Sequence, residues 1–391
     1  MDIKLSHRVQ RVKPSPTLAV TTRANELRAA GEDIIGLGAG EPDFDTPDHI
    51  KQAAIEAIQA GFTKYTAVDG TPALKQAILD KFRRDNRLAY DPDQVLVSCG
   101  GKQSFYNLCQ ALLDSGDEVI IPAPYWVSYP DMVLLADGSP VILEAGIEAG
   151  FKFTPAQLEA AITPRTRLVV INSPSNPSGM VYSRAELEAI GEILLRHPRV
   201  LVASDDMYEH ILWADEPFCN IVMACPELYD RSIVLNGVSK AYSMTGWRIG
   251  YAAGPAPLIR AMKKIQSQST SNPASISQVA AQAALEGDQG CIRVMLEAFQ
   301  ARHERVLAGL NAIGGVTCLP SQGAFYAFPD MRGFIERLGL EDDLQLAEHL
   351  IEKAGVALVP GSAFGSPGCM RLSFATSMEN LDEALRRIRA L

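Results

Sequence analysis

Short apolar segments alternate with helical segments through the middle of the chain, and this alternation constrains the fold more than any other feature. The apolar runs are rich in β-branched residues and bounded by turn residues, as buried strands are. They cover residues 94–98, 118–121, 167–172, 200–204, 232–235 and 248–253. Because strands that alternate with helices form a parallel sheet covered on both faces, the sequence predicts an α/β fold with a mainly parallel sheet.

Start signals mark the helices between these strands. A capping residue followed by proline occurs at Thr46-Pro47 and at Thr71-Pro72. Capping boxes occur at Ser183 with Glu186 and at Thr154 with Gln157. Residues 102–113 fit an amphipathic helix that ends at Asp114-Ser115-Gly116.

The pattern changes after about residue 290. A long helix over 290–313 precedes an aromatic-rich segment at 323–328, a helix at 342–354, strand-like runs at 356–359 and 370–374, and a terminal helix capped by Ser377. These elements predict a second, smaller α+β domain. A chain of 391 residues is long enough for two or three compact domains.

Composition and charge exclude several classes of partner. The net charge is −10, whereas binding to nucleic acid or to an acidic membrane needs a basic face. No apolar run approaches the roughly 18 residues of a membrane span. The N-terminus lacks an apolar signal core, so we expect a cytoplasmic protein. The cysteines form no Cys-x-x-Cys pair and the histidines lack ligand spacing, so no metal site is predicted and His210 is expected to be structural.

Lys240 lies just after the predicted strand at 232–235, where open α/β sheets bind their ligands. Partial burial there, with Arg248 eight residues further on, is expected to lower the pKa of this lysine. A neutral amine can form a Schiff base with a carbonyl. A lone lysine after a strand is more often a surface residue, so the surrounding residues must decide its role.

Other strand ends carry polar and aromatic side chains. Asp205 and Tyr208 follow the strand at 200–204. A carboxylate there can keep a pyridinium nitrogen protonated, and a phenol can donate to a ring oxygen. Asn176 and Trp126 follow two further strands. Each has an ordinary alternative, namely a solvated acidic turn for Asp205, turn chemistry for Asn176 and core packing for Trp126.

Two more segments suit anions. The strand-to-helix junction at 98–104 contains Gly101 and Lys102 and offers backbone N–H groups and a helix N-terminus to a phosphate. It is not a Walker loop, and the segment 36–40 is not a Gly-x-Gly-x-x-Gly motif, so a dinucleotide fold has weak support. Arg371 has a planar fork that suits a carboxylate, although a strand arginine by itself is most often a salt-bridge residue.

The segment from Ser239 to Tyr251, Ser-Lys-Ala-Tyr-Ser-Met-Thr-Gly-Trp-Arg-Ile-Gly-Tyr, resembles the lysine segment of the class I, fold type I aminotransferases, which use pyridoxal 5′-phosphate (PLP). The resemblance extends from about Val9 to the C-terminus. It implies that Lys240 carries PLP as a Schiff base and that Arg248 pairs with the cofactor phosphate.

The resemblance also implies which residues contact each part of PLP. Asp205 matches the partner of the ring nitrogen, Tyr208 and Asn176 match the partners of the ring oxygen, Trp126 matches the residue that stacks on the ring, Gly101 and Lys102 belong to the phosphate loop, and Tyr65 matches a tyrosine that reaches the phosphate across a dimer interface. Relatives usually have Glu-Ile where this chain has Asp206-Met207. Lys240, Asp205 and Tyr208 are the expected catalytic residues.

The substrate contacts are also implied by the resemblance. Arg371 matches the arginine that binds the substrate α-carboxylate, with Gly40, Asn176 and Trp126 beside it. Lys13 and Thr17, with Lys102, resemble residues of the aspartate/prephenate aminotransferase branch. Matches to Thr17 and Lys102 are associated there with accepting prephenate. A cation at Lys102 would favour a second carboxylate, as in aspartate or glutamate.

The resemblance divides the chain into an N-terminal arm at 1–14, a large PLP-binding domain at 48–295, and a small domain formed by 15–47 and 296–391. It implies a homodimer with active sites at the subunit interface. The predicted function is transfer of an amino group between aspartate or glutamate and a 2-oxo acid, namely oxaloacetate, 2-oxoglutarate or prephenate.

Other functions stay open. An alanine or kynurenine aminotransferase or a carbon–sulfur lyase of the same fold would share every cofactor residue. A non-catalytic regulator is another alternative, but it would need a DNA-binding extension. An NAD-dependent enzyme is a third alternative with weaker support.

Overall fold

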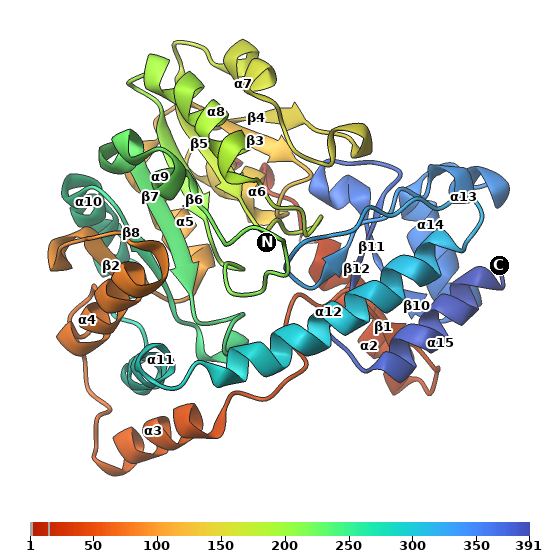
Figure 1. Ribbon diagram of the computed structural model, residues 1–391, viewed down its shortest axis with the longest axis horizontal. Coiled ribbons are helices and arrows are strands. Elements are labelled where there is room, and N and C mark those ends of the chain that lie inside the picture. The colour runs from red at the N-terminus through yellow and green to blue at the C-terminus, as the bar shows by residue number, and fades with distance from the viewer. Residues whose placement is uncertain (1–2, 15) are drawn as a thin grey trace.

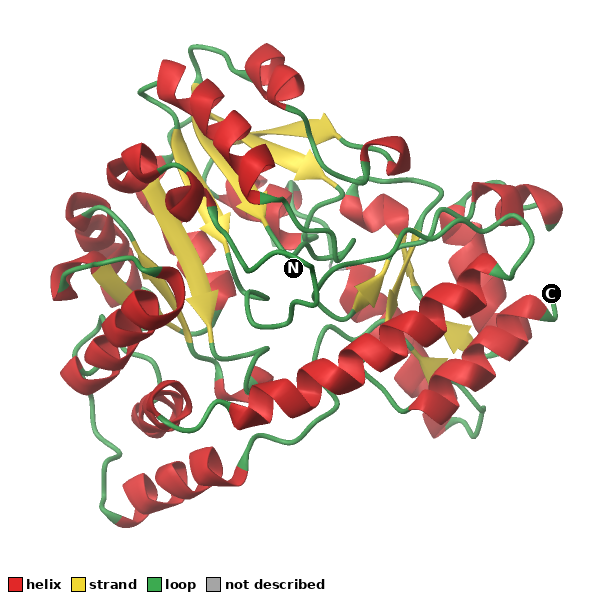
Figure 2. Ribbon diagram, in the orientation of Figure 1, coloured by secondary structure: helices red, strands yellow, loops and turns green. Residues whose placement is uncertain are grey.

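A computed structural model describes residues 3–14 and 16–391 and contains one large mixed sheet (Figures 1 and 2). The strands run in the order β2 (Val95–Ser98), β8 (Gly250–Ala253), β7 (Ser232–Gly237), β6 (Leu201–Asp205), β5 (Thr166–Asn172), β3 (Glu118–Ala123) and β4 (Ser139–Glu144). Strand β8 is antiparallel to both neighbours and the other pairings are parallel. The predicted strands and the α/β class are confirmed. Strand β4 was not predicted, because this sheet-edge strand is only half-buried and its apolar run, Val141 to Leu143, is short and follows a proline.

Helices cover both faces of this sheet, which explains why its central strands are apolar throughout. On one face, Leu96 and Val170 pack with α5 (Gly101–Leu112), α6 (Ser128–Leu135) and α10 (Ala256–Ser267). On the other, Val97 and Val169 pack with α4 (Pro72–Lys81), α8 (Arg184–Arg196) and α11 (Ser275–Glu286). Neighbouring strand residues point to opposite faces, so both must be apolar.

The remaining helices of this part are short or peripheral. They are α1 (His7–Gln10), α3 (Asp48–Gln59), α7 (Pro155–Ala161) and α9 (Ile221–Ala224). Helix α3 lies at one corner of the molecule and packs against α11 (Figure 2).

A second, smaller unit is built around α12 (Gly290–Asn311), which runs from the large sheet into this unit (Figure 1). Its antiparallel strands β11 (Val359–Pro360), β12 (Met370–Ser373) and β9 (Tyr326–Ala327) pack with α13 (Arg332–Arg337), α14 (Asp343–His349) and α15 (Met378–Arg389). Residues 350–354 continue α14 as a π-helical turn. The predicted α+β character of this half is confirmed.

The segment before residue 48 returns to this second unit. Strand β1 (Ile35–Gly36) pairs in parallel with β10 (Val356–Ala357), and α2 (Pro16–Ala29) lies beside β10 and β11 (Figure 1). This pairing agrees with assigning 15–47 and 296–391 to one domain, although the boundaries stay a prediction. Ser15, Met1 and Asp2 lie outside the described residues.

Most predicted helix starts are confirmed, but Thr46 is not a helix cap. Thr71, Thr154, Ser183 and Ser377 cap their helices with side-chain hydrogen bonds. Helix α3 instead begins at Asp48 after Pro47. The Thr46 hydroxyl donates to the Ser243 carbonyl at 2.7 Å and accepts from Trp247 Nε1 at 3.0 Å. A tertiary contact with the segment around Lys240 therefore takes the hydroxyl that local sequence assigned to a cap.

The N-terminal helix α1 is held to its own chain. Arg8 and Arg11 both form ion pairs with Asp137, just after α6. Whether the arm at 1–14 also reaches a neighbouring subunit stays a prediction.

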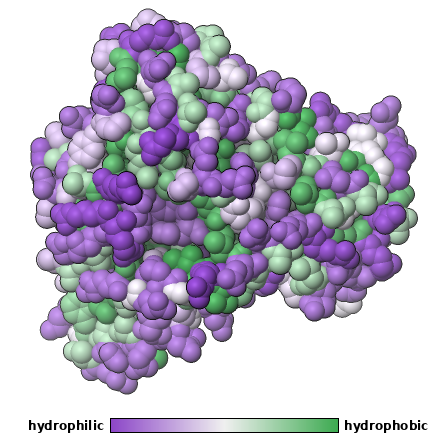
Figure 3. Space-filling model, viewed as in Figure 1, coloured by the Kyte–Doolittle hydropathy of each residue, from purple (hydrophilic) through white to green (hydrophobic). Residues whose placement is uncertain are grey.

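The polarity of the surface and of the helices agrees with the amino-acid composition of the chain. Hydrophilic residues cover most of the face in Figure 3, with apolar residues in smaller groups between them. In the part of the chain that the structure describes, no helix is both long and apolar enough to cross a membrane. The seven cysteines are free thiols.

Behind the large sheet's carboxyl edge lies a buried ion pair between Lys81 and Glu209. Lys81 also donates to Asn86 Oδ1 at 2.7 Å, while Asn86 and Asn236 donate to the two Glu209 oxygens at 2.8 and 2.9 Å. Burial alone raises the pKa of Glu209, but Lys81 and His210 hold that pKa below its ordinary value. The carboxylate is therefore charged and depends on its partners.

We predict that Lys81→Met strongly destabilises the protein. The substitution leaves Glu209 buried without its cation, which costs about 3–5 kcal/mol. Urea unfolding of the variant measures this loss. The matched control is Lys353→Met, because Lys353 is exposed; a loss of the same size in both variants would contradict the prediction.

Candidate active site

A cavity of about 400 Å³ lies between the large sheet and the second unit. The carboxyl ends of β5, β6 and β7 form one side, and α2, β9 and β12 contribute to the other. The predicted site residues that line it are Thr17, Gly40, Gly101, Lys102, Trp126, Asn176, Asp205, Tyr208, Lys240, Arg248 and Arg371. Tertiary structure thus brings together residues that are up to 354 positions apart, from Thr17 to Arg371.

Lys240 lies deep in this cavity. Its Nζ donates to the Gly40 carbonyl at 2.5 Å and lies 5.9 Å from the ring centroids of Tyr208 and Phe325. Burial and the nearby Arg371 guanidinium lower the pKa of Lys240 to about 8, with a smaller contribution from Arg248. The predicted direction is correct, but Arg371 rather than Arg248 is the more important cation. At mildly alkaline pH a substantial fraction of the amine is therefore neutral and nucleophilic.

Asp205 ends β6 and is held by a tyrosine that sequence analysis missed. The Tyr129 hydroxyl donates to Asp205 Oδ2, and the Met207 N–H donates to Oδ1 at 3.3 Å. Burial raises the pKa of Asp205, and the Tyr129 hydrogen bond opposes that rise. Tyr129 lies three residues after Trp126, but no pattern in the segment 122–129 indicates that the Tyr129 hydroxyl reaches Asp205.

Arg371 and Asn176 lie together on one side of the cavity. The Arg371 guanidinium donates to Asn176 Oδ1 at 2.9 Å and to the Gly38 carbonyl at 2.7 Å. Its Nε atom is buried and has no hydrogen-bond partner among residues 3–14 and 16–391. A buried, unpaired N–H on a fixed cation suits an anionic ligand.

The opposite end of the cavity suits a phosphate. Helix α5 begins at Gly101, and Gly100 before it has φ +88°, a conformation that glycine adopts without strain. A Cβ at Gly100 would lie 2.4 Å from an Arg248 terminal nitrogen, so the glycine lets the guanidinium approach the helix start. Arg248 itself donates to the carbonyls of Thr245 and Cys99 at 2.8 and 3.3 Å. A helix N-terminus and a fixed cation together bind anions well.

An aromatic wall and a lysine lie between these two ends. The Trp126 ring meets Tyr129 edge-on at 5.2 Å between centroids. Lys102 Nζ lies 5.2 Å from the Trp126 ring centroid, and partial burial with the nearby Arg248 lowers the pKa of Lys102. The cation predicted for the side-chain end of a substrate therefore faces the cavity.

Several lining residues were not singled out from sequence. They are Thr21, Glu41, Ser128, Asn172, Met207, Ser239, Thr245 and Tyr326. Ser239 and Thr245 lay inside the recognised lysine segment and could have been chosen from it. Glu41, which accepts from Thr245 at 3.0 Å, and Tyr326 had no local signal.

Two predicted residues do not line the cavity. Tyr65 is 92% exposed, and Lys13 is exposed near Asp131. The role of Tyr65 requires a second subunit, so a single chain does not test it.

A cluster of Asp85, Glu209 and His210 lies behind the site, with ligand atoms within 4.8 Å of one another. Its carboxylates are already paired, Glu209 with Lys81 and Asp85 with Arg84, and His210 Nε2 lies 3.1 Å from Asp85. The cluster has the chemistry of an ion-pair network.

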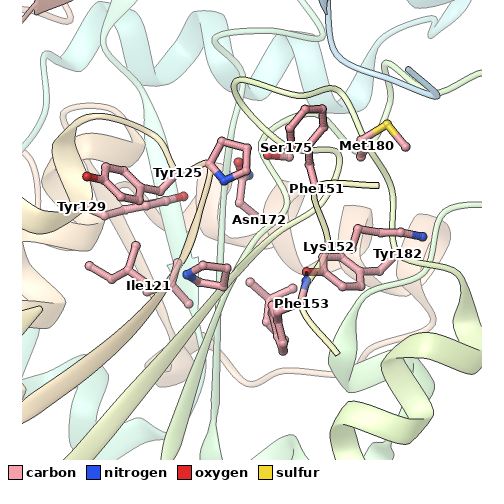
Figure 4. Close-up of a pocket in the computed structure, with 14 residues that line it drawn as sticks. Ile121, Tyr125, Tyr129, Phe151, Lys152, Phe153, Asn172, Ser175, Met180 and Tyr182 are labelled. Atoms are coloured by element: carbon pink, nitrogen blue, oxygen red, sulfur yellow. Dashed lines mark hydrogen bonds between the residues drawn. The ribbon is translucent and has the colours of Figure 1, made fainter. Parts of the chain in front are cut away.

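A second, small cavity of about 20 Å³ adjoins Tyr129 and is lined by Tyr125, Phe153, Lys152 and Tyr182 (Figure 4). It has room for about one water molecule and none for a substrate.

The donor set of the larger cavity suits PLP. An amine faces the space that an aldehyde would need, a carboxylate and hydrogen-bonding side chains surround the position of a ring, and the helix start suits a phosphate. The unpaired Nε of Arg371 leaves a place for a second anion.

Comparisons with known proteins agree with this chemistry. Residues 32–388 match the family described as aminotransferase class I and II. The chain is 62% identical to aspartate/prephenate aminotransferase of Nitrosomonas europaea, over 100% of both chains. It is 59% identical to aspartate/prephenate aminotransferase of Cereibacter sphaeroides, over 99% of this chain and 98% of the other.

Solved structures share the fold over the whole chain. Aspartate aminotransferase from Rhizobium meliloti superposes with a TM-score of 0.95 at 49% identity, over 100% of this chain and 98% of the other. Aspartate aminotransferase from Thermus thermophilus, solved with maleate, superposes with a TM-score of 0.94 at 44% identity over 100% of both chains.

We predict that Arg371→Leu raises the pKa of Lys240 from about 8 towards its ordinary value of 10.5, because a neighbouring cation no longer opposes protonation. In the cofactor-free protein, the rate at which Lys240 reacts with a small aromatic aldehyde should rise with pH through this pKa. The midpoint of that profile measures it. Arg165→Leu, at the opposite edge of the sheet, is the control and should leave the midpoint unchanged; a midpoint that stays near 8 in Arg371→Leu would refute the prediction.

Proposed function

The chain belongs to the class I and II aminotransferases, and on that premise we propose that it transfers an amino group between aspartate or glutamate and a 2-oxo acid. The acceptors in this proposal are oxaloacetate, 2-oxoglutarate and prephenate. The observation that carries it is a single cavity in which the Lys240 amine lies beside the buried Arg371 guanidinium with its unpaired Nε. Full-length relatives named for aspartate and prephenate support these substrates.

The enzyme uses PLP. When bound, this cofactor supplies an aldehyde that captures amines and a ring that withdraws electrons from the substrate Cα. In our proposal Gly101, Ser239 and Arg248 hold its phosphate, with Tyr65 from a second subunit. Trp126 and Lys102 border the ring, and Asn176 and Tyr208 meet its oxygen.

Lys240 is the proposed general base. Once its amine is free, Lys240 takes the proton from the substrate Cα. It then delivers a proton to carbon C4′ of the cofactor. Its lowered pKa supports this role, because a base with a pKa near the working pH is both unprotonated and basic enough. The Gly40 carbonyl fixes where the free amine lies.

Asp205 is the proposed partner of the ring nitrogen. An anionic carboxylate keeps that nitrogen protonated, and the Tyr129 hydrogen bond favours the anion against burial. The Tyr208 hydroxyl and the Asn176 amide position the ring oxygen on the other side.

Arg371 is the proposed binder of the substrate α-carboxylate, with the Gly40 backbone beside it. Asn176 and the Gly38 carbonyl already orient the guanidinium, so little further ordering is needed when a carboxylate arrives.

Lys102 and Thr17 are the proposed contacts for the side-chain end of the substrate, with Lys13 as an outer cation. The Thr17 hydroxyl is buried and lacks a hydrogen-bond partner within the described ranges 3–14 and 16–391. A polar substrate group would supply one. Lys13 does not line the cavity, so its part in the proposal rests on the resemblance alone.

We further propose a cytoplasmic homodimer with domains at 48–295 and at 15–47 with 296–391. Apolar side chains exposed on and after α3 support a second copy there: Ile55, Ile58, Phe62 and Tyr65 are 45, 52, 41 and 92% exposed. Sedimentation at the 42.3 kDa mass of one chain would contradict the dimer.

We predict that adding aspartate or glutamate to the PLP-loaded enzyme converts the cofactor's visible absorption in a single half-reaction. Lys240→Ala should lose this conversion, because the variant lacks the base. Stopped-flow absorbance with a panel of amino acids checks both statements. Faster conversion by alanine or kynurenine, or release of a thiol from cystathionine-type substrates, would favour the other fold type I enzymes instead.

We predict that Lys102→Ala lowers kcat/KM for aspartate by about 10- to 100-fold, the equivalent of one charged hydrogen bond. A monocarboxylic substrate such as alanine should lose much less, because it has no group for Lys102 to bind. Lys264→Ala, which removes an exposed lysine far from the cavity, is the control. Equal losses for dicarboxylic and monocarboxylic substrates would refute the role of Lys102.

A further inference from the structure

Tyr326 is a buried tyrosine of β9 to which none of the roles above is given. It is fully buried, lines the active-site cavity and comes from the second unit rather than from the large sheet. Its hydroxyl lies 2.9 Å from the Tyr208 hydroxyl. Its ring lies under Arg371, with 4.6 Å between the guanidinium carbon and the ring centroid. Tyr326 therefore touches both the residue proposed for the substrate carboxylate and the residue proposed for the cofactor ring oxygen.

The position of the Tyr326 hydroxyl is closely confined. A Cβ at Gly40 would lie only 3.1 Å from this oxygen, so the hydroxyl packs against the Gly40 backbone. Phe325 packs against both tyrosine rings, at 4.7 Å from Tyr326 and 5.6 Å from Tyr208 between centroids. Because the rings cannot turn freely, the hydrogen bond between the two hydroxyls is a fixed feature of the site.

Either hydroxyl could donate in that hydrogen bond, and the charge of Arg371 favours Tyr326 as the donor. A cation over the ring makes a phenol more acidic and therefore a better donor. Burial raises the pKa of Tyr326, and Arg371 acts against that rise. When Tyr326 donates, the proton of Tyr208 is free to point into the cavity, and accepting one hydrogen bond strengthens the one that Tyr208 donates.

A carboxylate on Arg371 changes this balance. It neutralises the positive charge over the Tyr326 ring, so Tyr326 becomes a weaker donor to Tyr208. The hydrogen bond from Tyr208 to the ring oxygen then weakens as well. The route Arg371–Tyr326–Tyr208 thus runs in parallel with the direct contact between Arg371 and Asn176.

We propose that Tyr326 is a positioning residue that orients the Tyr208 proton towards the cofactor ring oxygen and relays to it whether a carboxylate occupies Arg371. This inference rests on the proposed function, since it uses the roles given there to Arg371 and Tyr208. It adds a residue of the second unit that links the substrate-binding end of the site to the cofactor-binding end.

Titration of the bound cofactor's visible absorption with pH tests the relay. Maleate, an unreactive dicarboxylate, is the probe of the carboxylate site, and the midpoint is measured with and without it. In Tyr326→Phe, the midpoint without maleate should move by about 0.4–1 pH unit, the equivalent of one neutral hydrogen bond. The displacement caused by maleate should shrink relative to wild type, while the maleate dissociation constant stays within about threefold, since Arg371 and Asn176 are intact.

Two further variants make the test specific. Tyr90→Phe removes one buried hydroxyl that has no hydrogen-bond partner in the described part of the chain, and it should leave both midpoints unchanged. Adding Tyr326→Phe to Tyr208→Phe should have no further effect on the maleate displacement, because the relay then lacks its receiver.

The outcomes separate the inference from its premise. If the titration midpoints of Tyr326→Phe, with and without maleate, equal those of the wild-type enzyme, the relay is overturned and the role of Arg371 is not. Absence of any maleate effect in the wild-type enzyme, or an unchanged maleate affinity in Arg371→Leu, would overturn the role of Arg371 and the relay with it. Equal shifts in Tyr326→Phe and Tyr90→Phe would assign the effect to general loss of packing and also overturn the relay.

Discussion

The burial of two cations, Lys240 and Arg371, in one cavity is the constraint on which the rest of this structure depends. Charged groups removed from water need close hydrogen-bond partners. The same short connector supplies a partner to each, the Gly40 carbonyl for Lys240 and the Gly38 carbonyl for Arg371. The Arg371 guanidinium disfavours protonation of Lys240, and the lysine can respond by losing its proton whereas the arginine cannot. The reactivity of Lys240 is thus a consequence first of its own burial and second of the nearby Arg371 guanidinium.

The parallel sheet explains how the other groups reach the same place. Asn172 ends β5 and Asp205 ends β6, and the two are paired in register. Lys240 follows the end of the next strand, β7. Parallel strands deliver their carboxyl ends to one edge, so polar residues at these ends converge although they are far apart in sequence. The second unit then closes the cavity with Arg371 from β12 and Tyr326 from β9, which the parallel sheet alone could not position.

Residues that act through neighbours were the hardest to predict. Thr46 looks like a helix cap because proline follows it, yet its hydroxyl bonds to Ser243 and Trp247 about 200 residues away. No local sequence motif marks Tyr129 or Tyr326. Yet Tyr129 donates a hydrogen bond to Asp205, and Tyr326 shares one with Tyr208, and both partners are proposed catalytic residues. Local patterns describe what a residue can do with its chain neighbours. They carry no information about a partner that only folding brings near.

The sequence by itself determined the α/β class, most strand positions and the helix caps at Thr71, Thr154, Ser183 and Ser377, because these depend on hydrophobic period and on hydrogen bonds within one turn. The lysine segment also determined the family, since its residues are contiguous. Only the tertiary structure decided that Arg371 lowers the pKa of Lys240, that Tyr129 holds Asp205 and that Tyr326 joins Arg371 to Tyr208. Electrostatic effects and hydrogen bonds act through distance in space, and that distance is not written in the spacing of residues along the chain.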